Sequence, residues 1–153
     1  MDAGTVAAVV LSALALGVSV YFGWDTYEHN RRSVKPLPYV APNNYENHIS
    51  VRLWNYGSGP LILLDVSATH APSGRRGHLI DIAPHPPVGL LFDDFVRVTK
   101  GRAVPPGESL DLLAIGISDS KPLEVAYRRQ LRDFLGGVEV QVSYQNIYEK
   151  SSH

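Results

Sequence analysis

The apolar residues of this chain form one long uninterrupted run, followed by several short stretches in which apolar and polar positions alternate. The run, Ala3 to Trp24, contains no charged residue and no Asn, Gln, His or Pro. A helix of this length, at ~1.5 Å per residue, spans the ~30 Å hydrocarbon core of a bilayer and satisfies its own backbone hydrogen bonds there. The pattern predicts a transmembrane anchor over residues 1–34, with helix continuing through Glu28 to about Val34.

A cleaved signal peptide is the alternative interpretation of this run, because Ala13-Leu14-Ala15 resembles a small-residue cleavage site. Two observations favour the anchor: no Lys or Arg precedes the run, and the run continues well beyond that site. Aromatic residues also gather at its end, where their rings suit the headgroup boundary. These membrane-anchoring aromatic residues are Tyr21, Phe22 and Trp24.

The charges that flank the run predict its orientation. Asp2 precedes it, whereas Arg31, Arg32 and Lys35 come after it. By the positive-inside rule, we expect a single-pass protein of the inner (plasma) membrane whose C-terminal domain is cytoplasmic. The opposite topology stays open, because a short N-terminal anchor often exports the domain attached to its C-terminal end.

Small residues recur at every fourth position of the predicted helix, first Gly4, Ala8 and Ser12, then Ala15, Ser19 and Gly23. This spacing lets two helix backbones approach closely. The second row predicts packing against another membrane protein subunit or a second copy of the chain. The alternative is an Ala-rich helix that faces lipid on all sides.

Beyond the anchor, residues 35–44 contain three prolines and predict a semi-rigid spacer. From Tyr45 the pattern is typical of short strands separated by Gly- and Pro-rich turns. A helix is expected from Pro122 to Phe134, with caps offered by Ser118-Asp119-Ser120 and a stop at Gly136-Gly137. Strands are expected at 49–54, 61–68, 78–82, 109–117 and 138–144, and a strand or short turn at 90–98.

The predicted fold class is mainly β: an immunoglobulin-like antiparallel β-sandwich over residues 45–148, with one short inserted helix and a flexible tail at 149–153. The Cys…Trp…Cys hallmark of true immunoglobulin domains is missing, since the 153 residues include no Cys. Disulfides, thiolate metal sites and cysteine nucleophiles are therefore excluded.

Three stretches resemble a loose class of uncharacterised bacterial and phage single-pass membrane proteins that carry one C-terminal immunoglobulin-like β-sandwich. They are Asn55–Pro60 with the aliphatic strand after it, Pro106–Leu110, and Val140–Tyr148. The resemblance extends over most of the chain but depends on turn and strand signatures of low specificity. It implies this fold and a bacterial setting, and it transfers no catalytic residue.

Candidate metal ligands are few. His70 and His78 would face each other if Pro72–Arg76 formed a hairpin, and His85 and Asp81 lie nearby in the sequence. Strand alternation would place Asp81 on the opposite face from His78, so surface histidines are the preferred interpretation and no cofactor is expected.

Catalytic signatures are also weak. Asp93 and Asp94 are adjacent and would point to opposite faces of a strand, which favours blunting an edge strand or capping a turn over acid–base chemistry. Ser58 lies between two glycines, but a strand comes after it where a nucleophile elbow needs a helix. The chain is not expected to be an enzyme.

Two surfaces are candidates for interaction. Arg128, Arg129 and Arg132, with Lys121, would lie on the polar face of the predicted helix and could contact anionic membrane lipid; a solvated face is the alternative. Trp54 and Tyr56, beside a glycine turn, are either a binding site or ordinary packing. The net charge of -1 and the pI of about 6.6 argue against a nucleic-acid partner.

The sequence therefore predicts a non-catalytic, membrane-tethered β-sandwich interaction module, an accessory or assembly subunit of a membrane complex. The alternative is a sensor or effector subunit that binds a small ligand or anionic lipid and signals through transmembrane helix packing. A small metal-dependent enzyme built on the histidines is a third and weaker hypothesis.

Overall fold

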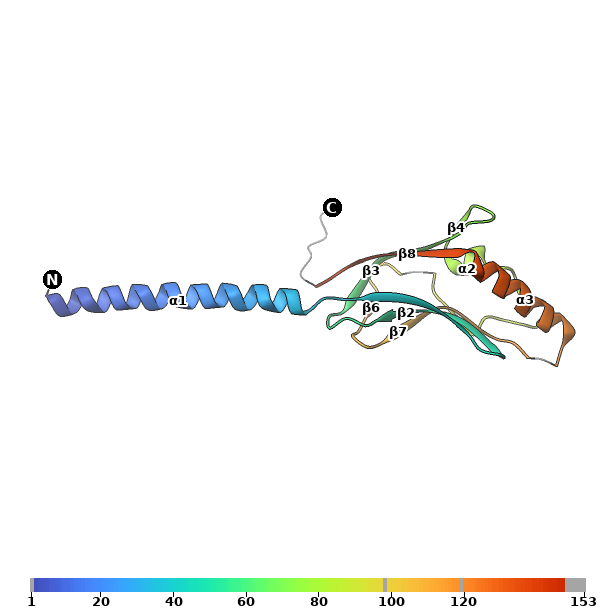
Figure 1. The fold of residues 1–153 in the computed structure, drawn as a ribbon, viewed down its shortest axis with the longest axis horizontal. Helices are drawn as coiled ribbons and strands as arrows, with labels where there is room; N and C mark the ends of the chain where they lie inside the picture. The colour runs from blue at the N-terminus through green and yellow to red at the C-terminus, as the bar shows by residue number, and fades with distance from the viewer. Residues whose placement is uncertain (1, 98, 119, 148–153) are drawn as a thin grey trace. The chain divides into compact units, whose positions relative to one another are not determined.

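The computed structural model describes residues 2–97, 99–118 and 120–147, without the side chains of Arg31 and Arg32. The chain divides into two compact units, Met1–Val34 and Lys35–His153. The first consists of a single helix, α1 (Ala3–Ser33), and the second contains two antiparallel β-sheets (Figure 1). We call the described part of the second unit, residues 35–147, the two-sheet domain.

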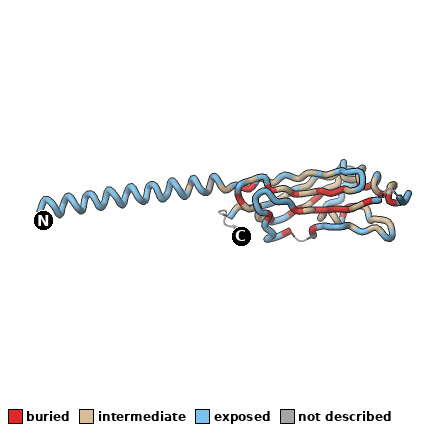
Figure 2. Tube along the Cα trace, turned by 90° about the horizontal axis from the view of Figure 1, so that it is seen from below, coloured by how far each residue is buried: buried red, intermediate tan, exposed pale blue. Residues whose placement is uncertain are grey.

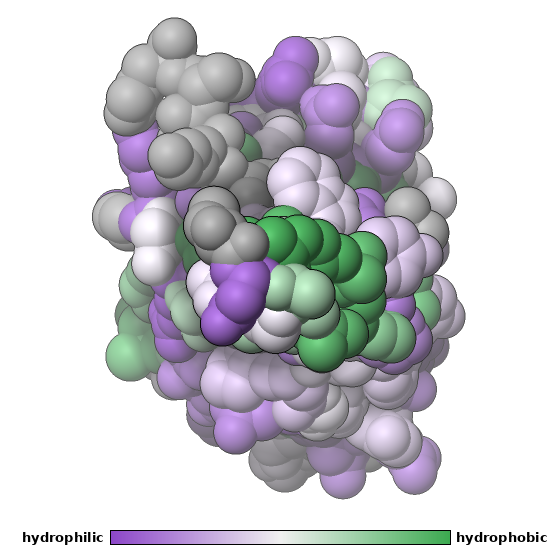
Figure 3. Space-filling model, turned by 90° about the vertical axis from the view of Figure 1, so that its left-hand side faces the viewer, coloured by the Kyte–Doolittle hydropathy of each residue, from purple (hydrophilic) through white to green (hydrophobic). Residues whose placement is uncertain are grey.

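From Ala3 to Trp24, helix α1 carries apolar or small side chains on all sides, and green predominates at the end of the helix that faces the viewer in Figure 3. Its side chains are exposed over nearly the full length (Figure 2). From Ala3 to Asn30 it is long and apolar enough, with a mean hydropathy of 2.2, to cross a membrane. The hydroxyls of Ser12 and Ser19 donate to the carbonyls of Ala8 and Ala15 at 2.8 Å, so neither needs a partner outside the helix. The predicted helix, including its continuation past Trp24, is confirmed.

The first sheet has the strand order β1-β2-β7-β5, and all its pairs are antiparallel. Alternation sets its faces: Leu53 of β2 lies between Val40 of β1 and Leu110 of β7, and these three point to the core. A bulge after Val51 shifts the register against β7. The strands are β1 (Pro38–Asn44), β2 (His48–Asn55), β5 (Asp94–Phe95) and β7 (Ser109–Gly116).

The second sheet is built on β3 (Leu61–His70). Strand β8 (Val138–Gln145) pairs with β3 from Ile62 to His70. The two short strands β4 (Arg75–Gly77) and β6 (Ala103–Val104) pair with the two ends of β3. Because β8 pairs with β3 at the same residues, both short strands must lie on the edge of β3 that β8 leaves open.

Both sheets contribute to one hydrophobic core, whose residues are among the buried, red segments of Figure 2. Helix α3 (Pro122–Gly136) adds Tyr127 and Leu131, and the single turn α2 (Leu79–Ile82) adds its first and last residues. Five of the least exposed side chains come from β2, β3 and β7: Leu53, Leu61, Leu63, Leu113 and Ile115.

The predicted spacer is wrong for most of its length, because Pro38–Asn44 forms the edge strand β1. Pro38 and Pro42 both lie in this strand. Proline lacks an N–H but is tolerated on an edge strand, and the polyproline backbone is close to the β conformation. The two-sheet domain thus begins at Lys35, ten residues earlier than the sequence predicts.

The predicted strand at 78–82 is also wrong. These residues form α2, with His78 at its N-cap and with Leu79 and Ile82 buried on one side. Apolar residues three apart fit one helical turn as well as a short irregular strand. In 90–98 only Asp94 and Phe95 are in a strand, and Val98 lies outside the described residues.

Helix α3 forms where it is predicted, but its cap differs. Lys121 is the N-cap residue and makes no capping bond with its side chain. The buried carboxylate of Glu124 instead accepts hydrogen bonds from the Ser118 N–H (3.1 Å) and the Lys121 ammonium (2.8 Å). Asp119, the middle residue of the predicted cap, lies outside the described residues.

One buried side chain fixes the segment that leads from α1 into the domain. Asn55 accepts hydrogen bonds from the N–H groups of Leu37 (3.2 Å) and Gly57 (3.0 Å). It donates to the carbonyls of Gly59 (2.8 Å) and Val104 (2.9 Å). A Cβ on Gly57 would clash with the Lys35 carbonyl oxygen, so this position requires glycine.

Candidate interaction surface

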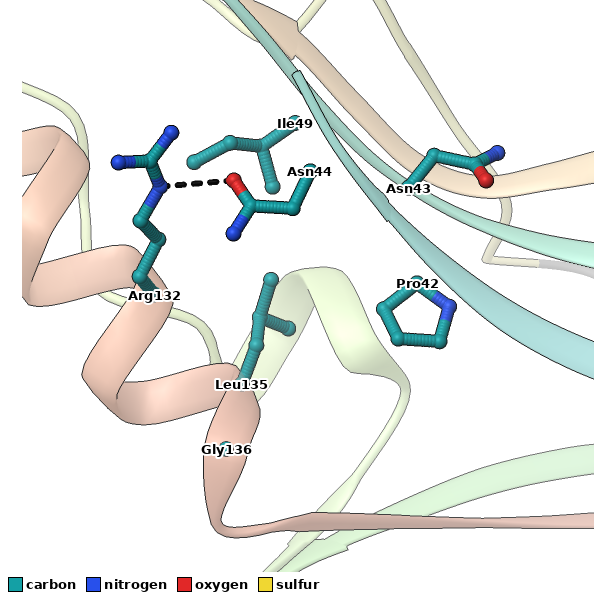
Figure 4. Close-up of a pocket in the computed structure, with 7 residues that line it drawn as sticks. All are labelled: Pro42, Asn43, Asn44, Ile49, Arg132, Leu135 and Gly136. Atoms are coloured by element: carbon teal, nitrogen blue, oxygen red, sulfur yellow. Dashed lines mark hydrogen bonds between the residues drawn. The ribbon is translucent and has the colours of Figure 1, made fainter. Parts of the chain in front are cut away.

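An apolar groove opens between the edge strands of the two sheets, β1 and β8. It consists of two adjoining hollows of about 220 and 230 Å³ that share Pro42 and Leu135. Figure 4 shows the hollow at the end of α3, with Leu135 between β1 and the helix. The remaining lining residues are Val40, Asn43, Asn44, Ile49, Val51, Arg132, Gly136, Val138 and Val140.

Two arginines of α3 hold the turn that borders this groove. Arg132 donates from Nε to Asn44 Oδ1 (2.7 Å; Figure 4) and from Nη2 to the Tyr45 carbonyl (3.1 Å). Arg128 donates to the carbonyl of Glu46. These acceptors are neutral, so the bonds fix the guanidinium groups without cancelling their charge.

The other basic residues predicted for this helix face have different surroundings. The Lys121 ammonium lies 2.8 Å from Glu124, and Arg129 is exposed to solvent. Because two of the three arginines are bound to the β1–β2 turn, a lipid-binding face on α3 would depend on Arg129 more than the sequence suggests.

The two edges that border the groove differ in what they offer a partner. Strand β1 carries two prolines, so two of its residues have no N–H. Strand β8 has eight residues and no proline. Among the described residues, no strand pairs with the edge of β8 that faces away from β3. Within the described part of the chain, the backbone groups on that edge are therefore available for hydrogen bonds.

Trp54 and Tyr56 belong to a cluster of three aromatic rings on the outer face of the first sheet. The rings of Trp54 and Tyr56 are parallel, with centroids 5.7 Å apart, and Tyr39 lies 5.8 Å from Tyr56. Tyr39 is directly opposite Trp54 in the register of β1 and β2. The three rings pack against one another, and Tyr39 and Tyr56 are also more than half exposed to solvent. Tyr39 is missed by sequence reasoning because the pattern places it in a spacer.

The structure does not bring the candidate metal ligands together. His70 pairs with Arg75 across the β3–β4 hairpin, so His78 lies beyond the last paired residue rather than opposite His70. The ring of His70 stacks on Phe134 at 4.5 Å and bonds Ser73 Oγ at 2.7 Å. His85 borders a separate shallow hollow beside α3. No cluster of three potential ligands exists among the described residues.

Asp93, Asp94 and Ser58, the residues with weak catalytic signatures, take part in local hydrogen bonds. Asp93 accepts a hydrogen bond from the Gly116 N–H, and Asp94 accepts one from the Phe95 N–H at 2.7 Å. The first bond ties the residue before β5 to the last residue of β7, and the second is local to β5. Ser58 lies in the turn before β3, and its N–H donates to the Lys35 carbonyl at 3.0 Å.

Two titratable groups near α3 have shifted pKa values with structural causes. The hydrogen bond from Lys121 is the largest influence on Glu124 and lowers the pKa of its carboxyl; burial opposes this and the Ser118 N–H adds to it. Burial raises the pKa of Tyr127 to about 12. The Tyr127 hydroxyl donates to the Pro84 carbonyl at 2.8 Å, which ties α3 to the loop after α2.

The residues predicted to anchor and pack the helix lie along α1 and at its end. Tyr21 and Phe22 contact each other edge to face at 5.8 Å, and Trp24 is 75% exposed. Ala15, Ser19 and Gly23 are exposed along the helix. Lys35 is exposed at the start of the two-sheet domain, and its carbonyl accepts from the turn after β2.

The groove is the feature that sequence reasoning missed. Its walls come from two pairs of consecutive elements, β1 with β2 and α3 with β8, and the two pairs are distant from each other in the chain. Only the alternation of Val138, Val140 and Val142 signals one of these walls. Comparison with known proteins adds no relative: no family model, no curated protein and no solved structure matches this chain.

Proposed function

We propose that this chain is a non-catalytic, membrane-tethered interaction module that serves as an accessory or assembly subunit of a membrane complex. One observation carries the proposal: an apolar groove beside an unpaired eight-residue strand edge, in a domain joined directly to a candidate membrane span. Such an edge binds other polypeptides readily.

The two antiparallel sheets with a shared core support an immunoglobulin-like β-sandwich as the architecture of this module. The charges that flank the apolar helix support an inner-membrane location with the two-sheet domain in the cytoplasm. Polar groups within the domain also favour a binding role over catalysis: Asn55, Glu124 and Tyr127 are all engaged in bonds that hold the fold.

Purification of the full-length protein from its native membrane in mild detergent, with mass spectrometry of the proteins that accompany it, tests the proposal. We expect a membrane protein at a fixed stoichiometric ratio. The control is residues 1–34 fused to an unrelated soluble domain, which reports partners that recognise the helix alone. Recovery of this chain without a partner would contradict the subunit role and favour a sensor that binds a small ligand or anionic lipid.

A further inference from the structure

Of the two strands that border the groove, only β8 presents an edge to which another strand can be added. Along β8 the backbone N–H and C=O groups that point away from β3 form an unbroken row, because the strand contains no proline. The opposite wall, β1, lacks N–H groups at Pro38 and Pro42. An added strand would therefore pair with β8 and lie over the groove, with β1 as the far wall.

The lining of the groove fits the side chains of such a strand. Val138 and Val140 occupy alternate positions of β8, with Val40 and Val51 across from them. Residues of an added strand that point inward would enter at the same two-residue spacing. Each hollow has several times the ~30 Å³ that a water molecule occupies in the liquid, which is room for apolar side chains.

A positive charge lies at one end of the groove. Arg132 lines it, and its two hydrogen bonds go to neutral acceptors. Within the described residues it forms no ion pair. A carboxylate of a bound segment would complement this charge. Since α3 leads directly into β8, Arg132 lies near the beginning of β8, and a C-terminal carboxylate there implies a strand antiparallel to β8.

A second copy of this chain fits the edge less well. Tyr144 and Asn146, at the end of β8, line a hollow together with Lys35 and Pro36, so the link to α1 is near that end. In an antiparallel pair of β8 strands the two links would lie at opposite ends, roughly 27 Å apart at ~3.4 Å per residue. Two copies anchored in one membrane would instead have their links on the same side.

We propose that the free edge of β8 binds an extended segment of another polypeptide by antiparallel strand addition. The segment carries apolar side chains at alternate positions, which fill the groove, and presents a carboxylate to Arg132. This proposal rests on the interaction-module function and specifies the chemistry of the partner.

The first test uses the full-length protein in detergent and a synthetic peptide as long as β8, made of alternating valine and threonine with a free C-terminal carboxylate. We expect the β8 amides that point away from β3 to exchange rapidly in the free protein and to become protected when the peptide binds. A peptide N-methylated at alternate backbone positions should not bind, because it keeps the side chains but loses N–H donors. Amidation of the terminus should weaken binding ~3-fold.

Protein variants supply the matched control. Val140→Lys places a charge in the groove and should weaken peptide binding at least ~10-fold, whereas Ser143→Lys adds the same charge at an exposed position of the same strand and should change it less than ~2-fold. Four results would each overturn the proposal. With the peptides, these are binding of the N-methylated peptide and no binding of the parent peptide. With the protein, they are equal peptide binding by the two variants and protection of the outward β8 amides before any peptide is added.

The same variants separate this inference from the proposed function. If wild-type protein purifies with a membrane partner and Val140→Lys retains it as well as Ser143→Lys does, strand addition is wrong while the subunit role stands. If no partner accompanies the wild-type protein, the subunit role itself fails. Loss of the partner in Val140→Lys alone, with the thermal unfolding of the two variants unchanged, supports both.

Discussion

Asn55 uses every hydrogen-bonding position of its side chain inside the domain. Its amide oxygen accepts two bonds and its amide nitrogen donates two, and the residue is completely buried. These bonds join the segment after α1, the turn after β2, and β6. The side-chain amide of Asn55 thus joins three parts of the chain through hydrogen bonds that belong to no helix or sheet.

Replacing this side chain should be costly. Asn55→Ala leaves two N–H groups and two carbonyls without their partner, at ~1–3 kcal/mol for each group that water cannot reach. We expect the free energy of unfolding to fall by about 3 kcal/mol or more, measured by urea denaturation. Asn43→Ala, the same substitution at a partly exposed position of β1, should change it by less than ~0.5 kcal/mol. Similar losses in the two variants would contradict this role.

The lowered pKa of the Glu124 carboxyl should make the stability of the domain depend on pH. Its carboxyl pKa is lowered from 4.5, chiefly by the hydrogen bond from Lys121, so the folded state favours the ionised form. The stabilisation is present above pH 4.5 and is lost as the pH falls through the lower folded pKa. Denaturation across this range should show a larger acid-induced loss for the wild type than for Glu124→Gln. Parallel pH profiles would show that the carboxylate does not stabilise the fold.

Ser50 differs from Asn55 because its buried side chain lacks a hydrogen-bond partner among the described residues. Its side chain is 1% exposed, and its hydroxyl has no hydrogen-bond partner among the described residues. Because a buried hydroxyl without a partner is unfavourable, Ser50→Ala should leave the free energy of unfolding unchanged or raise it by up to ~1 kcal/mol. Urea denaturation beside Ser67→Ala, at a half-buried position of β3, measures the difference. A loss of more than ~1 kcal/mol in Ser50→Ala would show that the hydroxyl is bonded.

At the scale of elements, α1 is predictable from the sequence because one local property determines it. A run of apolar residues this long needs no tertiary partner to be recognised. The edge strand β1 is missed for the converse reason: its backbone conformation is shared by free proline-rich segments, and only pairing with β2 distinguishes them. The turn α2 and the groove likewise depend on neighbours that are distant in the sequence.

The small residues of α1 allow a test of helix association. If Ala15, Ser19 and Gly23 form a packing face, replacing all three with Leu should prevent close approach and reduce crosslinking of the full-length protein in membranes at least ~5-fold. The control is a variant with altered side-chain shape elsewhere on the helix, in which Ile replaces Val10, Leu14 and Val18. Unchanged crosslinking in the Leu variant would show that α1 does not associate through this face.

At the scale of the whole molecule, the absence of cysteine makes the topology easy to measure. Ala71→Cys introduces one thiol at an exposed loop position of the two-sheet domain. With the domain in the cytoplasm, a membrane-impermeant maleimide should label this thiol in permeabilised cells but not in intact spheroplasts. Equal labelling in both would place the domain on the outer side.

The way the chain passes from α1 into the domain determines how tension would act on it. The backbone of Lys35 and Leu37 is bonded to the turn after β2, and β1 then pairs with β2 over all seven of its residues. A pull through Lys35 along the strand axis would try to slide β1 past β2. Bonds perpendicular to that direction must then break together rather than one after another. A load in that direction would place β1 and β2 in shear, the geometry in which a pair of strands withstands the greatest force.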